Sequence, residues 1–358
     1  MSNFINFNFW KKKKVFITGH TGFKGSWLCL ILNLLGAEVT GYALKPKTRN
    51  SLYEMAGIKK IIKKSIIADI RNYKKLENEI QKSKAEIIFH LAAQPLVRYS
   101  YDNPIETFET NILGTTNILE IIRKNRFIKT SILITSDKVY DTTYNKIYKE
   151  TDFLRGVDPY SSSKVCCEQI AYSYIKSFFK NSKQQKVATV RAGNVIGGGD
   201  YSKDRLIPDI FLSVENNKEV AIRNPHHTRP WQYVLEPLFG YIRLAQELFL
   251  GKKKVTQEEQ NWNFGPDVSN CRPVKYIVKY LSKQIPLKSK NLKKIINISN
   301  HETNFLRLNN KKSKRILQWF PKWNLNTSLD KIIEWNYLIK NHKVKLVCEK
   351  QIKEYLQF

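Results

Sequence analysis

The feature that most constrains this chain of 358 residues is a glycine-rich turn close to its beginning. An apolar run over residues 15–18 ends at Gly19, and two more glycines, Gly22 and Gly25, follow at three-residue spacing. Residues 26–35 then have the apolar density of a buried helix. A strand that leads through such a turn into a helix presents backbone N–H groups and the positive end of the helix dipole to a phosphate. The pattern therefore predicts a dinucleotide-binding site.

Each glycine of this turn has its own predicted role. Gly19 allows the tight turn, Gly22 lets a pyrophosphate approach the backbone, and Gly25 lets the helix pack closely on the strand. The alternative is an ordinary strand-to-helix turn, but the order of strand, glycine turn and helix favours cofactor binding. The residues between the glycines are further candidate contacts to the cofactor: Thr21, Phe23 and Lys24.

Strands alternate with helices over the first 190 residues. Further strands are predicted at residues 38–44, 65–70, 85–91, 131–135 and 187–191, and helices at residues 73–82 and 104–126. This alternation requires a parallel sheet covered on both faces. We therefore predict an α/β fold, a doubly wound parallel Rossmann sheet with a smaller C-terminal α/β lobe for the substrate.

The predicted domain boundaries follow from a looser pattern beyond residue 190, where helices are predicted near residues 235–250 and 273–283. Residues 11–190 are assigned to a cofactor-binding Rossmann domain that carries the catalytic residues. Residues 191–345 are assigned mainly to a substrate-binding lobe, with some segments returning to the Rossmann domain.

The formal net charge of +30 raises the possibility of nucleic-acid binding. The lysines, however, are scattered among Ile and Asn along the whole length, and they do not interleave with aromatic residues as in RNA-binding sheets. We expect weak attraction to polyanions and a preference for an anionic substrate, without a specific nucleic-acid partner. A non-catalytic Rossmann protein that binds RNA is the alternative from a different class.

Cysteine usage and the apolar runs bear on the compartment. The five cysteines show neither CxxC spacing nor a paired framework, which favours a reducing cytoplasm. Near the N-terminus apolar residues precede the lysines, the reverse of a signal peptide, and no apolar run reaches the roughly 18 residues of a membrane span. We expect no membrane association. His226 and His227 lack metal-ligand spacing to other residues, so no metal site is expected.

The end of the second strand departs from the usual dinucleotide pattern. An NAD-specific unit places Asp or Glu there to hold the ribose hydroxyls, whereas this chain has Ala43 or Leu44. The basic cluster at residues 45–49 could accept a 2′-phosphate, so the residues alone leave NAD and NADP open. Asp69 and Ile70, at the end of the third strand, could cover the adenine, although Asp69 could instead cap a helix.

Two groups of polar residues are predicted at the carboxyl ends of the strands, where open α/β sheets bind ligands. Ser136, Asp137 and Lys138 follow the fifth strand, and Tyr160 and Lys164 share one face of a helix. A lysine one turn from a tyrosine stabilises the phenolate, so the phenol can take a proton from a sugar hydroxyl. The alternatives are a structural Tyr/Lys pair and a solvated turn at 137–138.

Together with Leu91, Ala92 and Ala93 after the fourth strand, these motifs make the chain resemble an extended short-chain dehydrogenase/reductase. Residues 18–27, 94–98, 135–138, 191–200 and 229–234 resemble in particular the CDP-glucose 4,6-dehydratase family. This resemblance implies an NAD-dependent hydro-lyase, typically a homodimer, that converts CDP-glucose to CDP-4-dehydro-6-deoxyglucose. That family also lacks the acidic residue after the second strand.

The resemblance implies a role for each catalytic residue. Tyr160 removes the C4 hydroxyl proton, and Ser136 forms a hydrogen bond with that hydroxyl. Asp137 and Lys138 form an acid/base couple for elimination of water across C5–C6. The related dTDP-glucose dehydratases carry glutamate where Lys138 stands, and a lysine base must be neutral, hence desolvated or near another cation.

Further contacts are also implied by the resemblance. Leu91, Ala92 and Ala93, with Tyr160 and Lys164, line the cofactor site. The predicted substrate contacts are Gln94 and Arg98 at the sugar, Asn194 after the sixth strand, and Arg205 and Arg229 at the pyrophosphate. The alternatives are a UDP-sugar 4-epimerase, which needs no acid/base pair for elimination, and another nucleotide-sugar dehydratase of the same superfamily.

Overall fold

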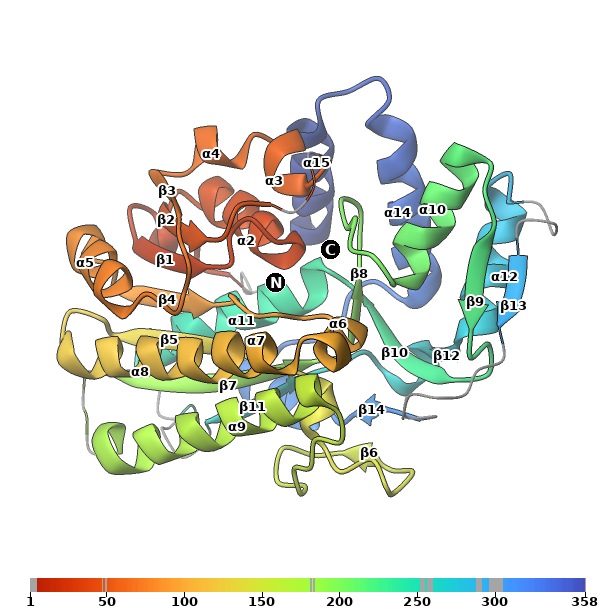
Figure 1. Ribbon diagram of the computed structural model, residues 1–358. Coiled ribbons are helices and arrows are strands. Elements are labelled where there is room, and N and C mark those ends of the chain that lie inside the picture. Colours follow the sequence, from red (N-terminus) through yellow and green to blue (C-terminus); the bar gives the residue numbers. More distant parts are fainter. Residues whose placement is uncertain are drawn as a thin grey trace.

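A parallel sheet of seven strands forms the centre of the protein, as a computed structural model shows (Figure 1). The structure describes residues 5–46, 48, 50–180, 182, 184–251, 255, 260–287, 292–295 and 305–357. The strand order is β3-β2-β1-β4-β5-β7-β11. The strands are β1 (Lys14–Thr18), β2 (Glu38–Ala43), β3 (Lys64–Ile67), β4 (Ile87–His90), β5 (Thr130–Ile134), β7 (Lys186–Ala192) and β11 (Asn261–Phe264). The chain reverses direction across the sheet between β1 and β4, so a ligand crevice is expected at their carboxyl ends.

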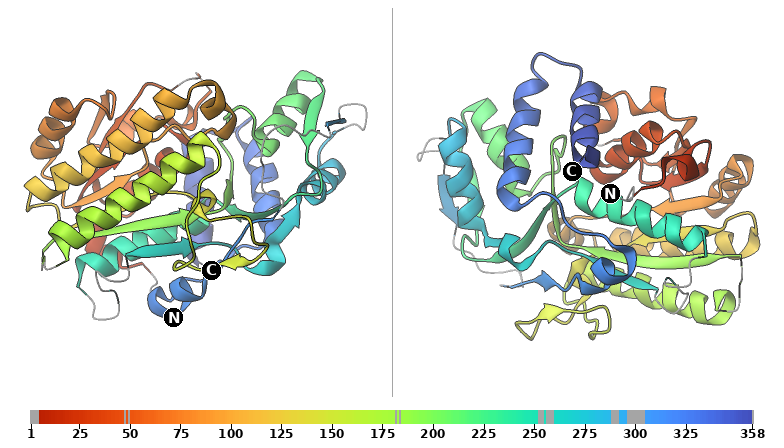
Figure 2. Two further views of the ribbon diagram at one scale, coloured as in Figure 1. Left: turned by 60° about the horizontal axis from the view of Figure 1, so that its bottom comes forward. Right: turned by 180° about the vertical axis from the view of Figure 1, so that it is seen from behind.

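Helices cover both faces of this sheet, which confirms the predicted doubly wound α/β fold (Figures 1 and 2). One face carries α5 (Tyr73–Ser83), α8 (Gly114–Lys124) and α9 (Pro159–Tyr174), and the other carries α2 (Phe23–Leu34), α11 (Leu235–Phe249) and α15 (Val344–Gln357). Neighbouring residues of one strand serve the two cores, since Phe16 packs with α5 and α8 whereas Ile17 packs with α2. The central strands are buried on both faces and are accordingly mainly apolar.

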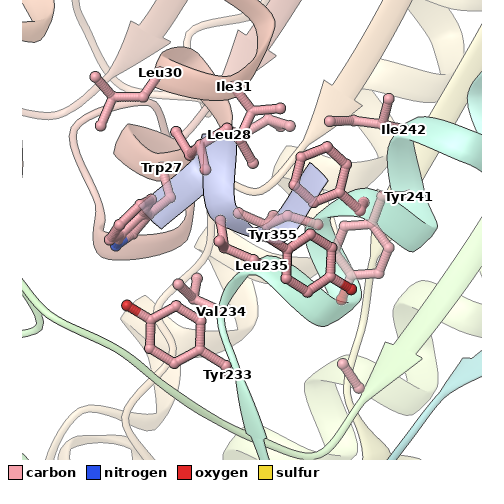
Figure 3. Packing of buried hydrophobic residues seen from close by; sticks show 14 of the residues in the cluster. Trp27, Leu28, Leu30, Ile31, Tyr233, Val234, Leu235, Tyr241, Ile242 and Tyr355 are labelled. Atoms are coloured by element: carbon pink, nitrogen blue, oxygen red, sulfur yellow. The ribbon is translucent and has the colours of Figure 1, made fainter. Parts of the chain in front are cut away.

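The core on the α2 side joins segments that lie far apart in the sequence. Trp27 and Leu28 of α2, Tyr233 and Leu235 at the junction of β10 and α11, and Tyr355 of α15 meet in one cluster (Figure 3). The Trp27 indole also donates a hydrogen bond to the Gly198 carbonyl at 3.0 Å. The glycine-rich turn that leads into α2 is therefore anchored to segments beyond residue 190.

The helix predicted at residues 104–126 differs from a regular helix. It consists of α7 (Pro104–Phe108), a π-helical turn (Glu109–Leu113) and α8. The π turn directs Asn111 inward, where its side chain accepts from the backbone N–H of Gln94 at 2.8 Å and donates to the Ser163 hydroxyl at 2.8 Å. The extra residue in the turn therefore serves a buried polar connection between the loop after β4 and α9.

The smaller lobe lies beyond the carboxyl ends of the strands of the main sheet (Figure 1). It contains β8 (Asn194–Ile196), α10 (Leu206–Asn216), β9 (Val220–Arg223), β10 (Thr228–Tyr233), β12 (Cys271–Pro273), α12 (Val274–Gln284), β13 (Leu292–Ile295) and α14 (Leu325–Leu338). The helices predicted near 235–250 and 273–283 correspond to α11 and α12. However, α11 and β11 pack on or pair with the main sheet, so segments beyond residue 190 return to it. The proposed boundary at residue 190 stays a prediction.

Shorter elements complete the described part of the chain. These are α1 (Phe7–Trp10), α3 (Leu52–Met55), α4 (Ile58–Ile61), α6 (Val97–Asp102), β6 (Ile147–Tyr148), β14 (Arg307–Leu308), α13 (Lys311–Leu317), 3-10 turns (Asp137–Val139 and Val268–Asn270) and a second π-helical turn (Ile175–Phe179). Within the residues described, every helix is too short or too polar to cross a bilayer.

Candidate active site

The glycine-rich turn has the geometry that its sequence predicts. Gly19 has a φ of +78°, and its N–H donates to the Tyr42 carbonyl of β2 at 2.8 Å. A Cβ on Gly25 would lie 2.1 Å from the Gly19 carbonyl oxygen, so only glycine permits this approach of α2 to the turn. Gly22, the N-cap of α2, is exposed, and a Cβ there would meet the same oxygen at 3.4 Å. The protein therefore does not itself require glycine at residue 22, but a ligand approaching the backbone there would.

The turn is tied to the neighbouring strand ends. The Thr21 hydroxyl donates to the Leu44 carbonyl at 2.9 Å, and the Ala92 N–H donates to the Thr18 hydroxyl at 3.1 Å. The Thr18 hydroxyl also shares a hydrogen bond of 2.8 Å with Nδ1 of His90. Ala92 lies so close to Gly19 that a Cβ on Gly19 would meet its nitrogen at 2.7 Å. These contacts thus join the carboxyl ends of β1 and β4, the two strands between which the strand order of the sheet reverses.

The ends of β2 and β3 are the predicted places for contacts to the ribose and the adenine. After β2 the side chains of Leu44 and Lys45 are exposed, and Lys47 and Arg49 of the basic cluster lie outside the described residues. The Asp69 carboxylate accepts from the Arg71 guanidinium at 2.7 Å, and Ile70 is buried. The N-cap of α5 is Asn72, so the alternative of a helix-capping Asp69 is wrong. The contacts of Asp69 and Ile70 to adenine stay predictions.

The predicted catalytic residues come together in one cleft at the carboxyl ends of β5 and β7. Ser136, Asp137, Lys138 and Tyr160 line it, and Lys164 lies one helical turn beyond Tyr160. The Ser136 hydroxyl acts to lower the pKa of the Tyr160 phenol. The Lys164 ammonium donates to the Ile134 carbonyl at 3.2 Å.

The beginning of α9 explains the position of the tyrosine. The Asp158 carboxylate accepts from the Ser161 N–H at 2.9 Å. The Ser161 hydroxyl in turn accepts from the Asp158 N–H, and the two bonds form a capping box. Pro159 occupies the first helical position, where it has no N–H to leave unpaired. Tyr160 is therefore fixed in the first turn of the helix, beside the end of β5.

The pKa of the Tyr160 phenol is raised, whereas the sequence predicts a lowered one. Burial raises it to about 12, although the contact with Ser136 acts in the opposite direction. Burial also lowers the pKa of Lys164. The expectation that Lys164 lowers the phenol pKa is corrected on this point, because the ammonium is directed to the Ile134 carbonyl and desolvation of the phenol dominates.

Asp137 has an unusual environment for a carboxylate. Its Oδ1 accepts from the Ser136 hydroxyl at 3.2 Å, while Oδ2 is buried without a hydrogen-bond partner among the described residues. Burial raises the pKa of this carboxyl, against the influence of Lys138, Arg229 and Lys24. Asp137 is therefore not a solvated turn residue, whereas Lys138 is only half-buried. An unsatisfied buried oxygen is costly, so a donor on a bound ligand would be favourable here.

The predicted substrate residues are placed differently from one another. Asn194, Arg98, Arg205 and Arg229 line the cleft. Arg205 is paired with Asp200 at 2.9 Å, and Arg98 with Asp204 at 3.2 Å. The buried Gln94 amide instead donates to the Thr107 hydroxyl at 2.8 Å and accepts from the Leu96 N–H at 2.6 Å. Any contact of Gln94 with a sugar would require these hydrogen bonds to be exchanged.

Two further cationic residues, Lys24 and Arg223, also line the cleft. Lys24 extends from the start of α2, and burial, together with Arg205 and Lys164, lowers its pKa to about 8. Sequence reasoning missed Arg223, which lies at the end of β9 and pairs with Asp204 at 2.8 Å. No sequence motif surrounds Arg223 that would have identified it as a residue of the cleft.

Comparisons with known proteins identify the family of the chain. Residues 16–332 match the family model described as GDP-mannose 4,6 dehydratase. The chain is 45% identical to CDP-glucose 4,6-dehydratase of Salmonella typhimurium, over 98% of both chains. It is 30% identical to dTDP-D-glucose 4,6-dehydratase of Dictyostelium discoideum, over 74% of this chain and 62% of that protein.

Solved structures show the same fold. The dTDP-glucose 4,6-dehydratase of Streptomyces venezuelae, with NAD and TYD bound, aligns with a TM-score of 0.78 at 18% identity, covering 91% of this chain and 97% of that one. The dTDP-glucose 4,6-dehydratase of Bacillus anthracis, in complex with NAD, aligns with a TM-score of 0.76 at 20% identity, covering 93% and 98%. At these identities the likeness concerns the fold alone.

Proposed function

Because the chain belongs to the GDP-mannose 4,6-dehydratase family, we propose that it is a CDP-glucose 4,6-dehydratase. It is a hydro-lyase that converts CDP-D-glucose to CDP-4-dehydro-6-deoxy-D-glucose. The observation that carries the proposal is the meeting of Asp137 and Lys138 with Ser136 and Tyr160 in one cleft. The identity of 45% over nearly the full length of the Salmonella typhimurium enzyme supports the choice of nucleotide and sugar.

The residues at the carboxyl ends of β1 and β4 fit NAD. The exposed backbone at Gly22 and the beginning of α2 suit a pyrophosphate, and Thr21, Phe23, Lys24 and the 91–93 segment flank the same edge. Tyr160 and Lys164 would contact the nicotinamide half. The chemistry that bound NAD supplies is the acceptance of a hydride from C4 of the sugar and its later return to C6.

The first chemical task of the chain is to remove the C4 hydroxyl proton. Ser136 would hold that hydroxyl, and the Tyr160 phenolate takes its proton. Because burial raises the pKa of the phenol to about 12, the uncharged form predominates near neutral pH in the chain alone. A positive charge placed beside the phenol lowers this pKa and so favours the phenolate.

The second task is the elimination of water. The 4-ketone makes the C5 proton acidic. Lys138, in its uncharged form, removes this proton, and protonated Asp137 protonates the C6 hydroxyl as it leaves. The raised pKa of Asp137 suits it to the role of acid, since a larger fraction carries a proton near neutral pH. The C5–C6 double bond forms as water departs, which leaves C6 ready for reduction.

Substrate binding is assigned to charged side chains around the same cleft. Arg205 and Arg229 would bind the pyrophosphate, and Arg98, Asn194 and Gln94 the sugar. Arg205 already holds a carboxylate, Asp200, in the geometry that a phosphate oxygen could take over.

A homodimer and a cytoplasmic location are further parts of the proposal. The elements α7 to α9, which lie side by side in Figure 1, and the π-helical turns after α7 and α9 expose large apolar side chains. Ile105 is 72% exposed, and Leu113, Tyr172 and Phe178 are about half exposed. Burying these side chains against a second copy would stabilise a dimer. Light scattering should give twice the chain mass, and Ile105→Glu should give a monomer. The free thiols of the five cysteines are compatible with a reducing compartment.

Incubation with CDP-, dTDP-, UDP- and GDP-glucose, followed by product identification by NMR, tests the proposed function. We expect a 4-keto-6-deoxy product from CDP-glucose and almost none from dTDP-glucose. Comparable turnover of dTDP-glucose would contradict the assignment. A galactose nucleotide formed without loss of water would instead identify a 4-epimerase, the alternative that does not need Asp137 and Lys138.

A further inference from the structure

A buried ion pair lies behind the cleft without lining it. Glu168 of α9 and Arg191 of β7 have side chains that are 2% and 1% exposed. The Arg191 guanidinium donates to both carboxylate oxygens, from Nε at 2.8 Å and from Nη2 at 2.9 Å. Neither residue is used by the chemistry proposed above.

The Glu168 carboxylate connects four separate elements. Besides Arg191, it accepts from the hydroxyl of Thr135 at 2.6 Å, from the hydroxyl of Thr189 at 2.7 Å and from the side-chain amide of Asn261 at 2.8 Å. These residues belong to α9, the end of β5, β7 and β11. Burial acts to raise the pKa of Glu168, but Arg191 and the hydroxyl donors hold it below its ordinary value. The group is therefore an anion surrounded by donors.

Two features connect Glu168 to the catalytic residues: its place on α9 and its hydrogen bond with Thr135. Tyr160, Lys164 and Glu168 recur every four residues along α9, so they share one face of the helix. Thr135, which donates to Glu168, immediately precedes Ser136. Together with the bond from Lys164 to the Ile134 carbonyl, this contact fixes α9 against the end of β5 at two points.

The other end of the ion pair holds the segment after Lys138. Nη1 of Arg191 donates to the Tyr140 hydroxyl at 2.8 Å and to the Glu150 carbonyl at 3.2 Å. The Tyr140 hydroxyl in turn donates to the side chain of Asn263 at 2.8 Å. The residues on both sides of the 136–138 segment are thus fastened to the same pair.

We propose that Glu168 is a positioning residue: paired with Arg191, it holds Tyr160 on α9 in register with the 136–138 segment after β5. The inference rests on the proposed function, because it concerns the geometry of that reaction. A purely structural ion pair would affect folding stability alone. A positioning residue also affects kcat and the titration of the groups it positions.

The charge of Glu168 gives the inference a second readout. Burial lowers the pKa of the Lys164 ammonium, whereas Cys167 and then Glu168, one helical turn away, act to raise it. In Glu168→Gln this support is lost, and the Arg191 cation is left without its anion. The pKa of Lys164 should therefore fall. Because glutamine has the same shape, the change tests charge and hydrogen bonding rather than packing.

The experiment compares Glu168→Gln with Glu236→Gln. Glu236 is also fully buried, accepting from the Trp323 N–H at 2.7 Å and the Tyr355 hydroxyl at 2.6 Å, but it lies outside the cleft lining. With CDP-glucose, Glu168→Gln should lower kcat by about 10- to 100-fold while KM changes by less than about threefold. Glu236→Gln should lower the melting temperature and leave kcat unchanged.

The Lys164 titration is measured without substrate. NMR of protein labelled with ¹³C at lysine Cε, assigned with Lys164→Arg, should show a lower pKa of Lys164 in Glu168→Gln and an unchanged one in Glu236→Gln. An unchanged titration in Glu168→Gln would overturn the inference. This measurement also separates the two hypotheses, since a wild-type protein inactive on CDP-glucose would contradict only the proposed function.

Thr135 variants provide the test if Glu168→Gln does not fold. Thr135→Val removes only the hydroxyl that joins Glu168 to the end of β5 and leaves the ion pair in place. We expect kcat to fall by about 3- to 10-fold, with recovery in Thr135→Ser, which restores the hydroxyl. Equal kcat values for the valine, serine and wild-type proteins would contradict a positioning role.

Discussion

Gly25 lies so close to Gly19 that a Cβ on Gly25 would come within 2.1 Å of the Gly19 carbonyl oxygen. The first turn of α2 is thereby pressed against the end of β1, and the N-terminal N–H groups of the helix point to the edge where the sheet reverses. Gly22 sits on the open side of the same turn. Two glycines three residues apart therefore meet different physical requirements.

Alanine substitutions should separate these two requirements. Gly25→Ala should lower the free energy of unfolding by about 1–3 kcal/mol or more, since the turn must shift to admit a methyl group. Gly22→Ala should cost at most about 1 kcal/mol at this N-cap, while NAD binding weakens strongly. Thermal unfolding and NAD titration of both variants test this. Equal loss of stability in the two proteins would contradict the assignment.

The absence of a carboxylate after β2 leads to a prediction about the cofactor. Leu44, 53% exposed, occupies the region where an acidic residue usually holds the ribose hydroxyls. We expect weaker NAD binding than in enzymes with that carboxylate, with NAD still the working cofactor. Titration with both dinucleotides measures this. NADP bound at least about tenfold more tightly, a difference of about 1.4 kcal/mol, would reverse the choice.

Local sequence patterns predicted the sheet well but not its ends and edge. The strand predicted at residues 65–70 stops at Ile67, because the Asp69 side chain accepts from the Arg71 N–H at 2.8 Å and turns the chain. Strand β11 was not predicted, because its four residues alternate asparagine with aromatic side chains and do not form an apolar run. Those asparagines are satisfied by Glu168, Glu150 and Tyr140, which are remote in sequence.

The candidate site was likewise predictable from local sequence only in part. Tyr160 and Lys164 were recognisable because one helix carries both at a fixed spacing. The buried pair of Glu168 and Arg191 joins two elements, and neither residue has a local pattern that reveals its partner. The raised pKa of Tyr160 likewise depends on how deeply the assembled fold buries the phenol.

A pH-dependent stability is predicted from Glu236. Burial raises the pKa of this carboxyl to about 7, above its value of about 4.3 in an unfolded chain. The folded state therefore binds the proton more tightly, and this stabilisation is complete below about pH 4 and is lost as the pH rises to about 7. Relative to Glu236→Gln, the wild type should lose as much as about 3 kcal/mol over this range. Urea unfolding at several pH values measures it; a difference that stays constant with pH would contradict the raised pKa.

The oxidation step should depend on Tyr160 alone among the proposed acid/base groups. Tyr160→Phe removes the acceptor of the C4 hydroxyl proton, so mixing with CDP-glucose should produce no enzyme-bound NADH absorbance. Lys138→Ala leaves that step intact and should accumulate NADH and a 4-keto-glucose nucleotide in a single turnover. General acid–base groups typically contribute about 10²- to 10⁴-fold, so the effect should be large. Near-normal dehydration by Lys138→Ala would require another base.

The elimination step can be divided further with Asp137→Asn. Asparagine retains the shape of the side chain but cannot give a proton to the departing C6 hydroxyl, whereas Lys138 remains able to exchange the C5 proton. In heavy water we expect deuterium to enter C5 of the bound 4-keto sugar while loss of water slows by about 10²-fold or more. Lys138→Ala should show the converse, with slow or absent exchange at C5. Mass spectrometry of the quenched nucleotide reports both events, and loss of C5 exchange in Asp137→Asn would assign proton abstraction to Asp137 instead of Lys138.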